Sequence, residues 1–265
     1  MLRVQPIAVV ALASMISIST GVSAEEWKFN LGAGVGVAPD YEGSDDYQPV
    51  PLIAAKAERD WFFAELRGTK ARANIVPSKM WRAGPLVNYR FKRNNVDDDA
   101  VDDLRTVDEA WELGAFGEFQ YRNPNDKRYR ITLGLEVAKD VASGHEGTLF
   151  EASAGYKAPL LLLGDNARWN IGVSSSYASS DYMDAYFSVD ADNAQRSGLS
   201  EFSADDGIKD VGVNVGLDYG FTENWGFNGR LAYTRLVGDA EDSPIVDDRG
   251  SPNQLFIGLS IGYQW

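Results

Sequence analysis

The feature that most constrains this chain is a strict alternation of apolar and polar residues over long segments. In residues 254–265 every second side chain is apolar or aromatic, and the positions between them are mostly Gly, Ser and Gln. A repeat of two residues is that of a β-strand, whose successive side chains point to opposite faces, and it does not fit the repeat of a helix. The same pattern recurs at 27–37 and 211–221. The alternation therefore predicts an all-β chain.

Applied along the whole sequence, the pattern predicts twelve strands. They are expected at 27–37, 48–57, 61–67, 69–76, 81–92, 110–122, 128–138, 148–157, 168–178, 210–221, 224–236 and 254–265. The pair at 61–76 alternates least regularly, and without it the count falls to ten. An even number is the rule for bacterial single-chain barrels.

Such strands could form either a soluble sandwich or a transmembrane antiparallel up-and-down β-barrel. Most of the expected strands are long enough to cross a bilayer at a tilt, whereas strands of soluble proteins are shorter on average. Their polar face carries Gly, Asn, Ser and charge, as a polar lumen requires. The chain also ends on an aromatic residue, like the strand signature read by the outer-membrane barrel assembly machinery, although Phe is more usual there. The residues of that signal are Ile257, Leu259, Ile261, Tyr263 and Trp265. We therefore predict a barrel in the bacterial outer membrane.

Residues 1–24 predict export. Arg3 supplies positive charge, Ile7 to Ile18 are largely apolar, and Val22-Ser23-Ala24 offer a cleavage site for signal peptidase. The apolar stretch is shorter than a spanning helix needs, which disfavours a membrane anchor. We expect a cleaved signal peptide at 1–24 and one barrel domain at 25–265. The absence of Cys excludes disulfides and thiolate metal sites, and export without Cys suits a bacterial envelope.

The lengths of the connections predict the orientation. The short connections 58–60, Gly68, 122–127 and 222–223 are expected in the periplasm, and the long ones at 38–47, 93–109, 139–147, 179–209 and 237–253 outside the cell. Six of the seven tryptophans then fall at the periplasmic strand ends, where an interfacial aromatic girdle is expected, and Trp111 falls at the outer end. The six are Trp27, Trp61, Trp81, Trp169 and Trp225, together with Trp265.

Charge is distributed unevenly along the chain. The formal net charge of −14 argues against a nucleic-acid partner, which requires a basic surface. The acids concentrate in the long connections, where they would keep the loops soluble and contact lipopolysaccharide through bridging divalent cations. A dedicated Ca²⁺ site is the sharper alternative, but no segment has the EF-hand ligand spacing. We therefore predict no resident metal and no cofactor.

A second set of charges is expected to face the lumen. Its members are Lys28, Arg82, Arg90, Glu112, Glu118, Glu136, Asp218 and Arg230, with Arg122 and Arg130 beside them. Buried charges must be paired, so these residues could cross-brace a plugged barrel. The alternative is a narrow water-filled pore with weak selectivity.

Catalytic patterns are weak. The single His145 lies in a turn-like segment, Ser143 to Gly147, where we expect a solvated loop tip. A His and acid pair activating water at the outer rim is the competing interpretation. No nucleophile elbow, phosphate loop or HExxH motif is present. The sequence therefore predicts a protein that is not an enzyme.

Several segments resemble the MltA-interacting protein (MipA)/OmpV family. They are Ala38-Pro39-Asp40-Tyr41-Glu42-Gly43-Ser44, Gly84-Pro85-Leu86-Val87-Asn88-Tyr89-Arg90, Asp184 to Val189, Ser197-Gly198-Leu199, Gly207 to Gly212, Asp242 to Val246 and Arg249 to Gln254. The resemblance spans essentially the whole chain after residue 24. It implies an outer-membrane barrel whose founding member is regarded as a scaffold between a murein-degrading lytic transglycosylase and a murein synthase. It brings no catalytic residues with it.

The function predicted from the sequence is therefore a non-enzymatic murein scaffold. A scaffold would use the periplasmic rim, where the exposed apolar contact is expected at Leu160, Leu161, Leu162 and Leu163. An interfacial anchor in the inner leaflet is the competing interpretation of these leucines. A small diffusion pore or uptake channel, and a surface adhesin acting through the acidic loops, are the alternative functions.

Overall fold

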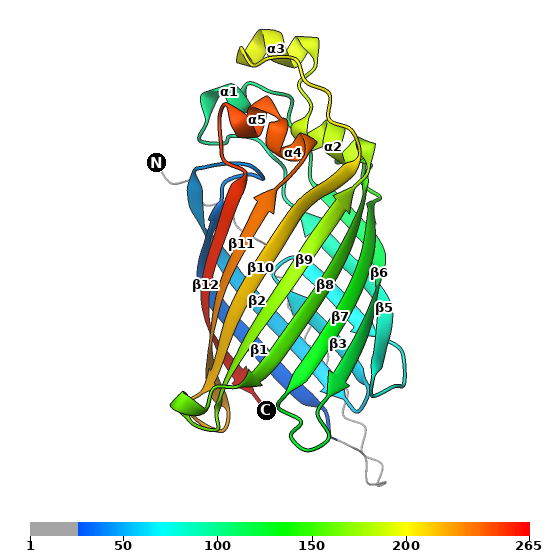
Figure 1. The fold of residues 1–265 in the computed structure, drawn as a ribbon, viewed down its shortest axis with the longest axis vertical. Coiled ribbons are helices and arrows are strands. Elements are labelled where there is room, and N and C mark those ends of the chain that lie inside the picture. The colour runs from blue at the N-terminus through cyan, green and yellow to red at the C-terminus, as the bar shows by residue number, and fades with distance from the viewer. Residues whose placement is uncertain (1–25) are drawn as a thin grey trace.

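The computed structural model describes residues 26–265, which form a closed antiparallel barrel of twelve strands (Figure 1). The strands are β1 (Lys28–Pro39), β2 (Tyr47–Arg59), β3 (Phe62–Arg67), β4 (Lys70–Asn74), β5 (Trp81–Arg90), β6 (Ala110–Arg122), β7 (Arg130–Asp140), β8 (Thr148–Pro159), β9 (Ala167–Ala178), β10 (Gly207–Gly220), β11 (Trp225–Leu236) and β12 (Asn253–Gln264). Each strand pairs with its neighbours in the chain, and β1 pairs with β12 to close the ring. The predicted barrel of twelve strands rather than ten is confirmed. The signal peptide predicted at 1–24 lies outside the described residues.

The alternation of the sequence becomes the two faces of the wall. On β12 the outward side chains of Leu255, Ile257, Leu259 and Ile261 are 37–52% exposed. The intervening positions, such as Ser260, face the lumen. In a membrane, lipid covers the apolar outer face. Exposed apolar side chains that would be unfavourable in water are therefore stable there. Among residues 26–265 no helix is long and apolar enough to cross a membrane.

The wall is irregular at the short hairpin of β3 and β4. We expected Gly68 in a periplasmic turn, and that expectation is wrong. Because β3 starts at the end with the short turns, the turn that follows it points the other way and lies partway up the wall. There the Gly68 N–H donates to the Ile53 carbonyl oxygen at 2.8 Å. Gly68 has φ of +59°, a conformation that costs glycine little.

A buried side chain repairs the ladder where β4 ends. The Asn74 amide donates to the carbonyl oxygens of Trp61 (2.6 Å) and Val76 (3.1 Å), and its oxygen accepts from the N–H of Ala83 (2.9 Å). Asn74 is fully buried. Pro85 follows closely on β5 and has no N–H to offer a neighbouring strand. Side-chain hydrogen bonds of Asn74 therefore supplement the backbone ladder at this point, where one backbone bond, from Ile75 N–H to the Ala83 carbonyl oxygen, remains.

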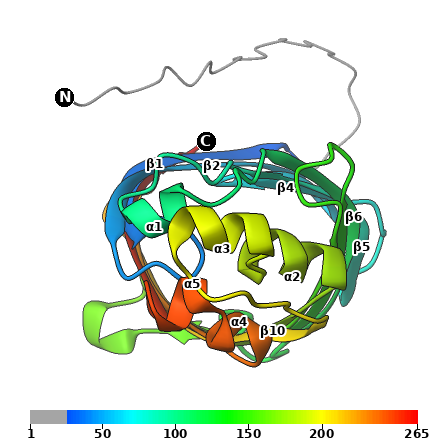
Figure 2. The same cartoon turned by 90° about the horizontal axis from the view of Figure 1, so that it is seen from above.

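The long connections fold over one end of the barrel. They contain α1 (Asp99–Asp102), α2 (Ser180–Phe187), α3 (Ala191–Ser197), α4 (Asp239–Asp242) and α5 (Pro244–Asp247). Figure 2 shows α2 and α3 lying across the mouth, with α1, α4 and α5 around them. The short turns and the C-terminus lie at the opposite end (Figure 1), which we assign to the periplasm. That end also carries the 3₁₀ turn η1 (Leu161–Leu163).

Candidate functional site: the lumen beneath the loop cap

The loops over the outer mouth, here called the cap, have a hydrophobic core of their own. One cluster joins α2 to the barrel and includes Tyr182, Met183, Phe187, Leu236 and Val246, each no more than 1% exposed. A second cluster joins α1, α3 and α5 and is made of Tyr41, Val101, Leu104, Val189, Leu199 and Ile245. A core built from four separate connections holds the cap as a folded unit, so the outer mouth is covered by packed structure.

Acidic residues of the loops have structural partners. Asp98 and Asp190 accept N-cap hydrogen bonds at the starts of α1 and α3. Asp98 also pairs with Arg249 at 2.7 Å, and Asp184 pairs with Arg105 at 2.9 Å, so that ion pairs tie one loop to another. Within residues 26–265 no group of three or more His, Cys, Asp or Glu side chains is arranged to hold a metal ion. Part of the acidic surplus therefore organises the cap.

Directly beneath the cap, Glu112 is the acceptor for three donors. Its carboxylate, 2% exposed, accepts from Arg90 Nε (2.9 Å) and Asn88 Nδ2 (2.6 Å), and its Oε1 lies 3.0 Å from His145 Nε2. The guanidinium of Arg90 also lies over the ring of Tyr182 at 5.2 Å. One buried carboxylate on β6 thus connects two side chains of β5 to the His145 loop at the top of the lumen.

A second buried network links the cap to β10. Glu42 accepts from the Tyr182 hydroxyl at 2.6 Å and pairs with Lys209, which also pairs with Asp210 at 2.6 Å. Burial by itself would raise the pKa of Glu42, but the charges of Lys209 and Arg90 outweigh it and hold that pKa below its usual value. Glu42 is therefore ionised in the folded protein and attaches the first loop to both α2 and the wall.

Sequence alternation could not have located Lys209. By its odd number it should share the outward face of Val211, yet it is 5% exposed and inside. The register of β9 and β10 shifts between Ile208 and Asp210, so Lys209 is the extra residue of a β-bulge. A bulge breaks the repeat of two and turns a side chain to the other face.

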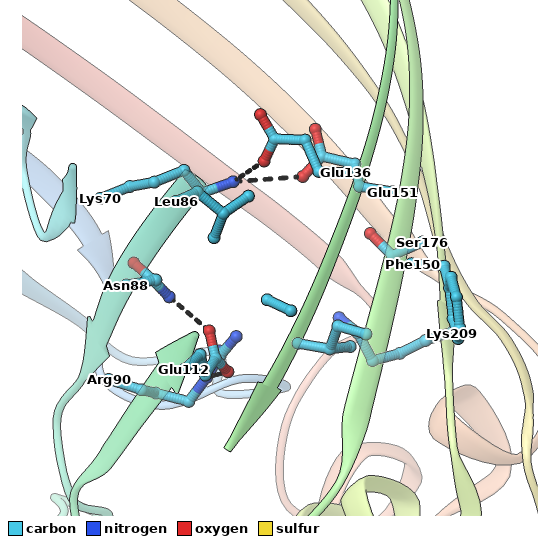
Figure 3. Close-up of a pocket in the computed structure, with 12 residues that line it drawn as sticks. Lys70, Leu86, Asn88, Arg90, Glu112, Glu136, Phe150, Glu151, Ser176 and Lys209 are labelled. Atoms are coloured by element: carbon cyan, nitrogen blue, oxygen red, sulfur yellow. Dashed lines mark hydrogen bonds and ion pairs between the residues drawn. The ribbon is translucent and has the colours of Figure 1, made fainter. Parts of the chain in front are cut away.

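Midway down the lumen, Arg72 connects charges from several strands. It pairs with Glu65 at 2.5 Å, Glu136 at 3.4 Å and Glu118 at 3.7 Å, and lies over the ring of Phe116 at 4.8 Å. Lys70 reaches Glu136 and Glu151 from the same hairpin (Figure 3). A polar cavity of about 100 Å³ lies between this layer and the Glu112 network. The sequence prediction missed Glu65, Lys70 and Arg72, because β3 and β4 alternate weakly.

The predicted lumen charges separate into two groups. Arg82, Arg90, Glu112, Glu118, Glu136 and Asp218 have oppositely charged partners. Among the described residues, Lys28 and Arg230 have no carboxylate within 4.0 Å. The opposite wall, formed by β10, β11, β12 and β1, turns mostly small residues inward. Most of the paired charges therefore come from β3 to β8, and the other half of the wall contributes fewer, among them Lys209 and Asp218 on β10.

The expected solvated position of His145 is wrong. Its side chain is 0% exposed, and its ring contacts those of Tyr182 and Tyr186 with centroids 4.9 and 5.8 Å away. The segment is held because Asp140 accepts from the backbone N–H of both His145 and Glu146. Since the cap covers the ring, the imidazole has no access to water at the outer rim. Because the residues that bury His145 are remote in the sequence, the residues around His145 give no indication of its burial.

The structure places the predicted aromatic girdle and the leucine turn at the periplasmic end, and the predicted assembly signal along the outward face of β12. Trp27, Trp61, Trp81, Trp225 and Trp265 lie there, 38–59% exposed, and Trp169 lies near the start of β9. Trp265, the last residue of the predicted assembly signal, follows β12, where Phe29 stacks on it at 5.6 Å. Leu160 and η1 form the turn after β8, in which Leu162 is 93% exposed. These are positions at which an aromatic girdle and a rim contact would be found.

Comparison with known proteins agrees with this architecture. The family model described as MltA-interacting protein MipA matches residues 31–265. The chain belongs to that family. The MltA-interacting protein of Escherichia coli K12 is 26% identical over 248 residues, which cover 89% of this chain and 91% of that protein. Outer membrane protein Omp26La of Vibrio anguillarum is 32% identical over 158 residues, 53% of this chain and 56% of its own length.

Relatives named as outer-membrane proteins also establish the location. OmpV of Vibrio cholerae is 34% identical over 90 residues, 34% of this chain and 33% of that protein. Among solved structures, an outer membrane channel from Pseudomonas putida F1 shares the fold with a TM-score of 0.51 at 9% identity, over 94% of this chain and all of the channel. This MipA-family chain is an outer-membrane β-barrel.

Proposed function

We propose that this MipA-family barrel is a non-enzymatic scaffold that holds a murein-degrading lytic transglycosylase near a murein-synthesising enzyme. The proposal takes its partner class from the name of the Escherichia coli relative, MltA-interacting protein. The observation that carries it here is the folded cap over the outer mouth. A barrel that is covered outside and accessible at the periplasmic end suits a periplasmic partner better than transport.

The charged layers of the lumen support the same proposal. Arg72 and Glu112 each bind groups from neighbouring strands, and such cross-bracing stiffens the wall. A diffusion pore is the competing function. In planar bilayers the scaffold should give no steady ohmic conductance steps, whereas a pore should give them in every insertion.

The deciding experiment is co-purification from crosslinked cell envelopes. The full-length protein should retain a lytic transglycosylase, and a barrel of another family at equal expression should not. Failure of the protein to retain any murein enzyme would reject the scaffold.

The leucine turn offers a test of where the partner binds. We propose that Leu161 and Leu162, 64% and 93% exposed, contribute an apolar contact. Replacing both with Ser should weaken retention of the transglycosylase while the barrel still assembles. The matched control is Val141→Ser, an exposed apolar residue at the cap end. If the double Ser variant retains the enzyme and the barrel in vesicles only becomes less stable to urea, the turn is an anchor in the inner leaflet.

A further inference from the structure

A basic arc lines the periplasmic mouth of the lumen. Five neighbouring strands, β5 to β9, each supply one cation at the level where the strand meets the short turns. The members are Arg82, Arg122, Arg130, Lys157 and Arg168. Strand pairing puts Arg122 opposite Arg130 and Arg130 opposite Lys157, and Arg168 lies opposite Asp218. The register therefore sets Arg122, Arg130 and Lys157 side by side on the lumen face. Arg82 lies opposite Glu118, further up the wall, and Arg168 lies opposite Pro159, closer to the turn.

Carboxylates of the barrel neutralise this arc only in part. Glu118 pairs with Arg82 at 3.2 Å, and Asp218 pairs with Lys157. Arg122, Arg130 and Arg168 have no carboxylate within 4.0 Å in the part of the chain that the structure describes; Arg122 donates to the neutral Gln120 at 2.8 Å. Like charges directly opposite one another on a sheet are destabilising. Arg122 and Arg130, which lie directly opposite one another, therefore carry positive charge that no carboxylate of the described residues neutralises by direct contact.

We infer that the basic arc binds an extended acidic segment of a periplasmic protein, which enters the lumen from the periplasmic end. Neighbouring strands lie about 4.8 Å apart, so the five cations span roughly 19 Å along the wall. That width exceeds a single small anion and fits several carboxylates on an extended chain. The cap closes the other entrance, and because the arginines point into the lumen they face away from the headgroups of the inner leaflet.

The wall opposite the arc turns mainly small residues inward at this end. Across from β6 and β7 lie β12 and β1, whose inward positions at this end include Asn30, Gly32, Ser260 and Gly262. Arg122 and Arg168 are themselves exposed, so the mouth is accessible. The periplasmic turns are short and present little surface, and the lumen mouth adds the area that a partner needs. This inference rests on the proposed scaffold function and specifies where the partner docks and which chemistry it presents.

The test uses the full-length barrel in lipid nanodiscs and a fluorescent oligoglutamate peptide as the probe. The variant is R122Q/R130Q/R168Q, and the matched control, R59Q/K79Q/K127Q, removes the same charge from exposed positions outside the lumen on the same end. We expect the first variant to bind the peptide at least about tenfold more weakly, since hydrogen bonds to charged groups are lost. The control should bind within about twofold of the parent, as expected for exposed charges.

A second readout asks whether the peptide occupies the lumen. The chain has no cysteine, so Ser260→Cys places a single thiol on the wall opposite the arc. Oligoglutamate should slow modification of this thiol by a maleimide, and should not do so in the R122Q/R130Q/R168Q background. Equal binding by all variants, equal loss in the control, or an unprotected thiol would overturn the inference.

Other occupants give different results. If murein fragments or inorganic phosphate protect the thiol and oligoglutamate does not, the arc binds a glycan or a small anion, and the peptide site is rejected. If R122Q/R130Q/R168Q still retains the transglycosylase, the docking site is wrong while the scaffold stands. If the parent binds oligoglutamate but no murein enzyme co-purifies, the scaffold fails and the peptide site remains.

Discussion

Replacing Glu112 with Gln should destabilise the buried network at the top of the lumen, beneath the cap. The substitution keeps the size of the side chain but removes the negative charge of the carboxylate that Arg90, Asn88 and His145 all contact. Removing one partner of a buried pair costs about 3–5 kcal/mol. The side chain of Arg90 is 28% exposed and lies over Tyr182, so the lower end applies. We expect the free energy of unfolding to fall by about 3 kcal/mol.

The assay is urea unfolding of the barrel in lipid vesicles, followed by tryptophan fluorescence, on E112Q, R90M and the double variant. Because the two residues share one interaction, the double variant should lose about 2 kcal/mol less than the sum of the single losses. The control is Glu151→Gln, a lumen carboxylate with a 41% exposed side chain, 3.7 Å from Lys70. It should cost less than about 1 kcal/mol. If the losses of E112Q and R90M add to within about 0.5 kcal/mol, Glu112 and Arg90 do not stabilise the barrel through a shared interaction.

Three further predictions concern the cap and the wall. The pKa of Glu42 is lowered in the folded state, so the ionised side chain stabilises the fold fully above the usual pKa of 4.5, and this stabilisation is lost as the pH falls through the folded pKa. The difference in unfolding free energy between the parent and Glu42→Gln should therefore shrink in acid. A difference that stays constant with pH would contradict this. Gly147→Ala should cost about 1–3 kcal/mol and speed proteolysis of the cap, because its Cβ would lie 2.5 Å from the Tyr182 backbone nitrogen. Gly117→Ala, which meets nothing within 4 Å, is the control, and equal proteolysis of both would refute the contact. Asn74→Ala should lower the unfolding free energy by about 2 kcal/mol by orphaning buried backbone groups; a loss below about 0.5 kcal/mol would mean that water replaces the amide.

The wall of this barrel could be predicted from the sequence because its signal is local. A strand needs only alternate apolar side chains, and Ile257, Leu259 and Ile261 face outward wherever the rest of the chain lies. The strand count and the aromatic end of the barrel follow from the same repeat and from the lengths of the connections. Membrane location follows as well, because a solvent of lipid is what makes such an outer face stable.

What fills and covers the barrel was decided by tertiary structure. Lys209 turns inward only because a bulge interrupts the ladder between β9 and β10, and the Gly68 turn lies partway up the wall because β3 and β4 are short. His145 is buried because α2, more than thirty residues further along the chain, packs over it. These arrangements depend on contacts between segments that are distant in the sequence, so the local alternation of apolar and polar residues does not predict them.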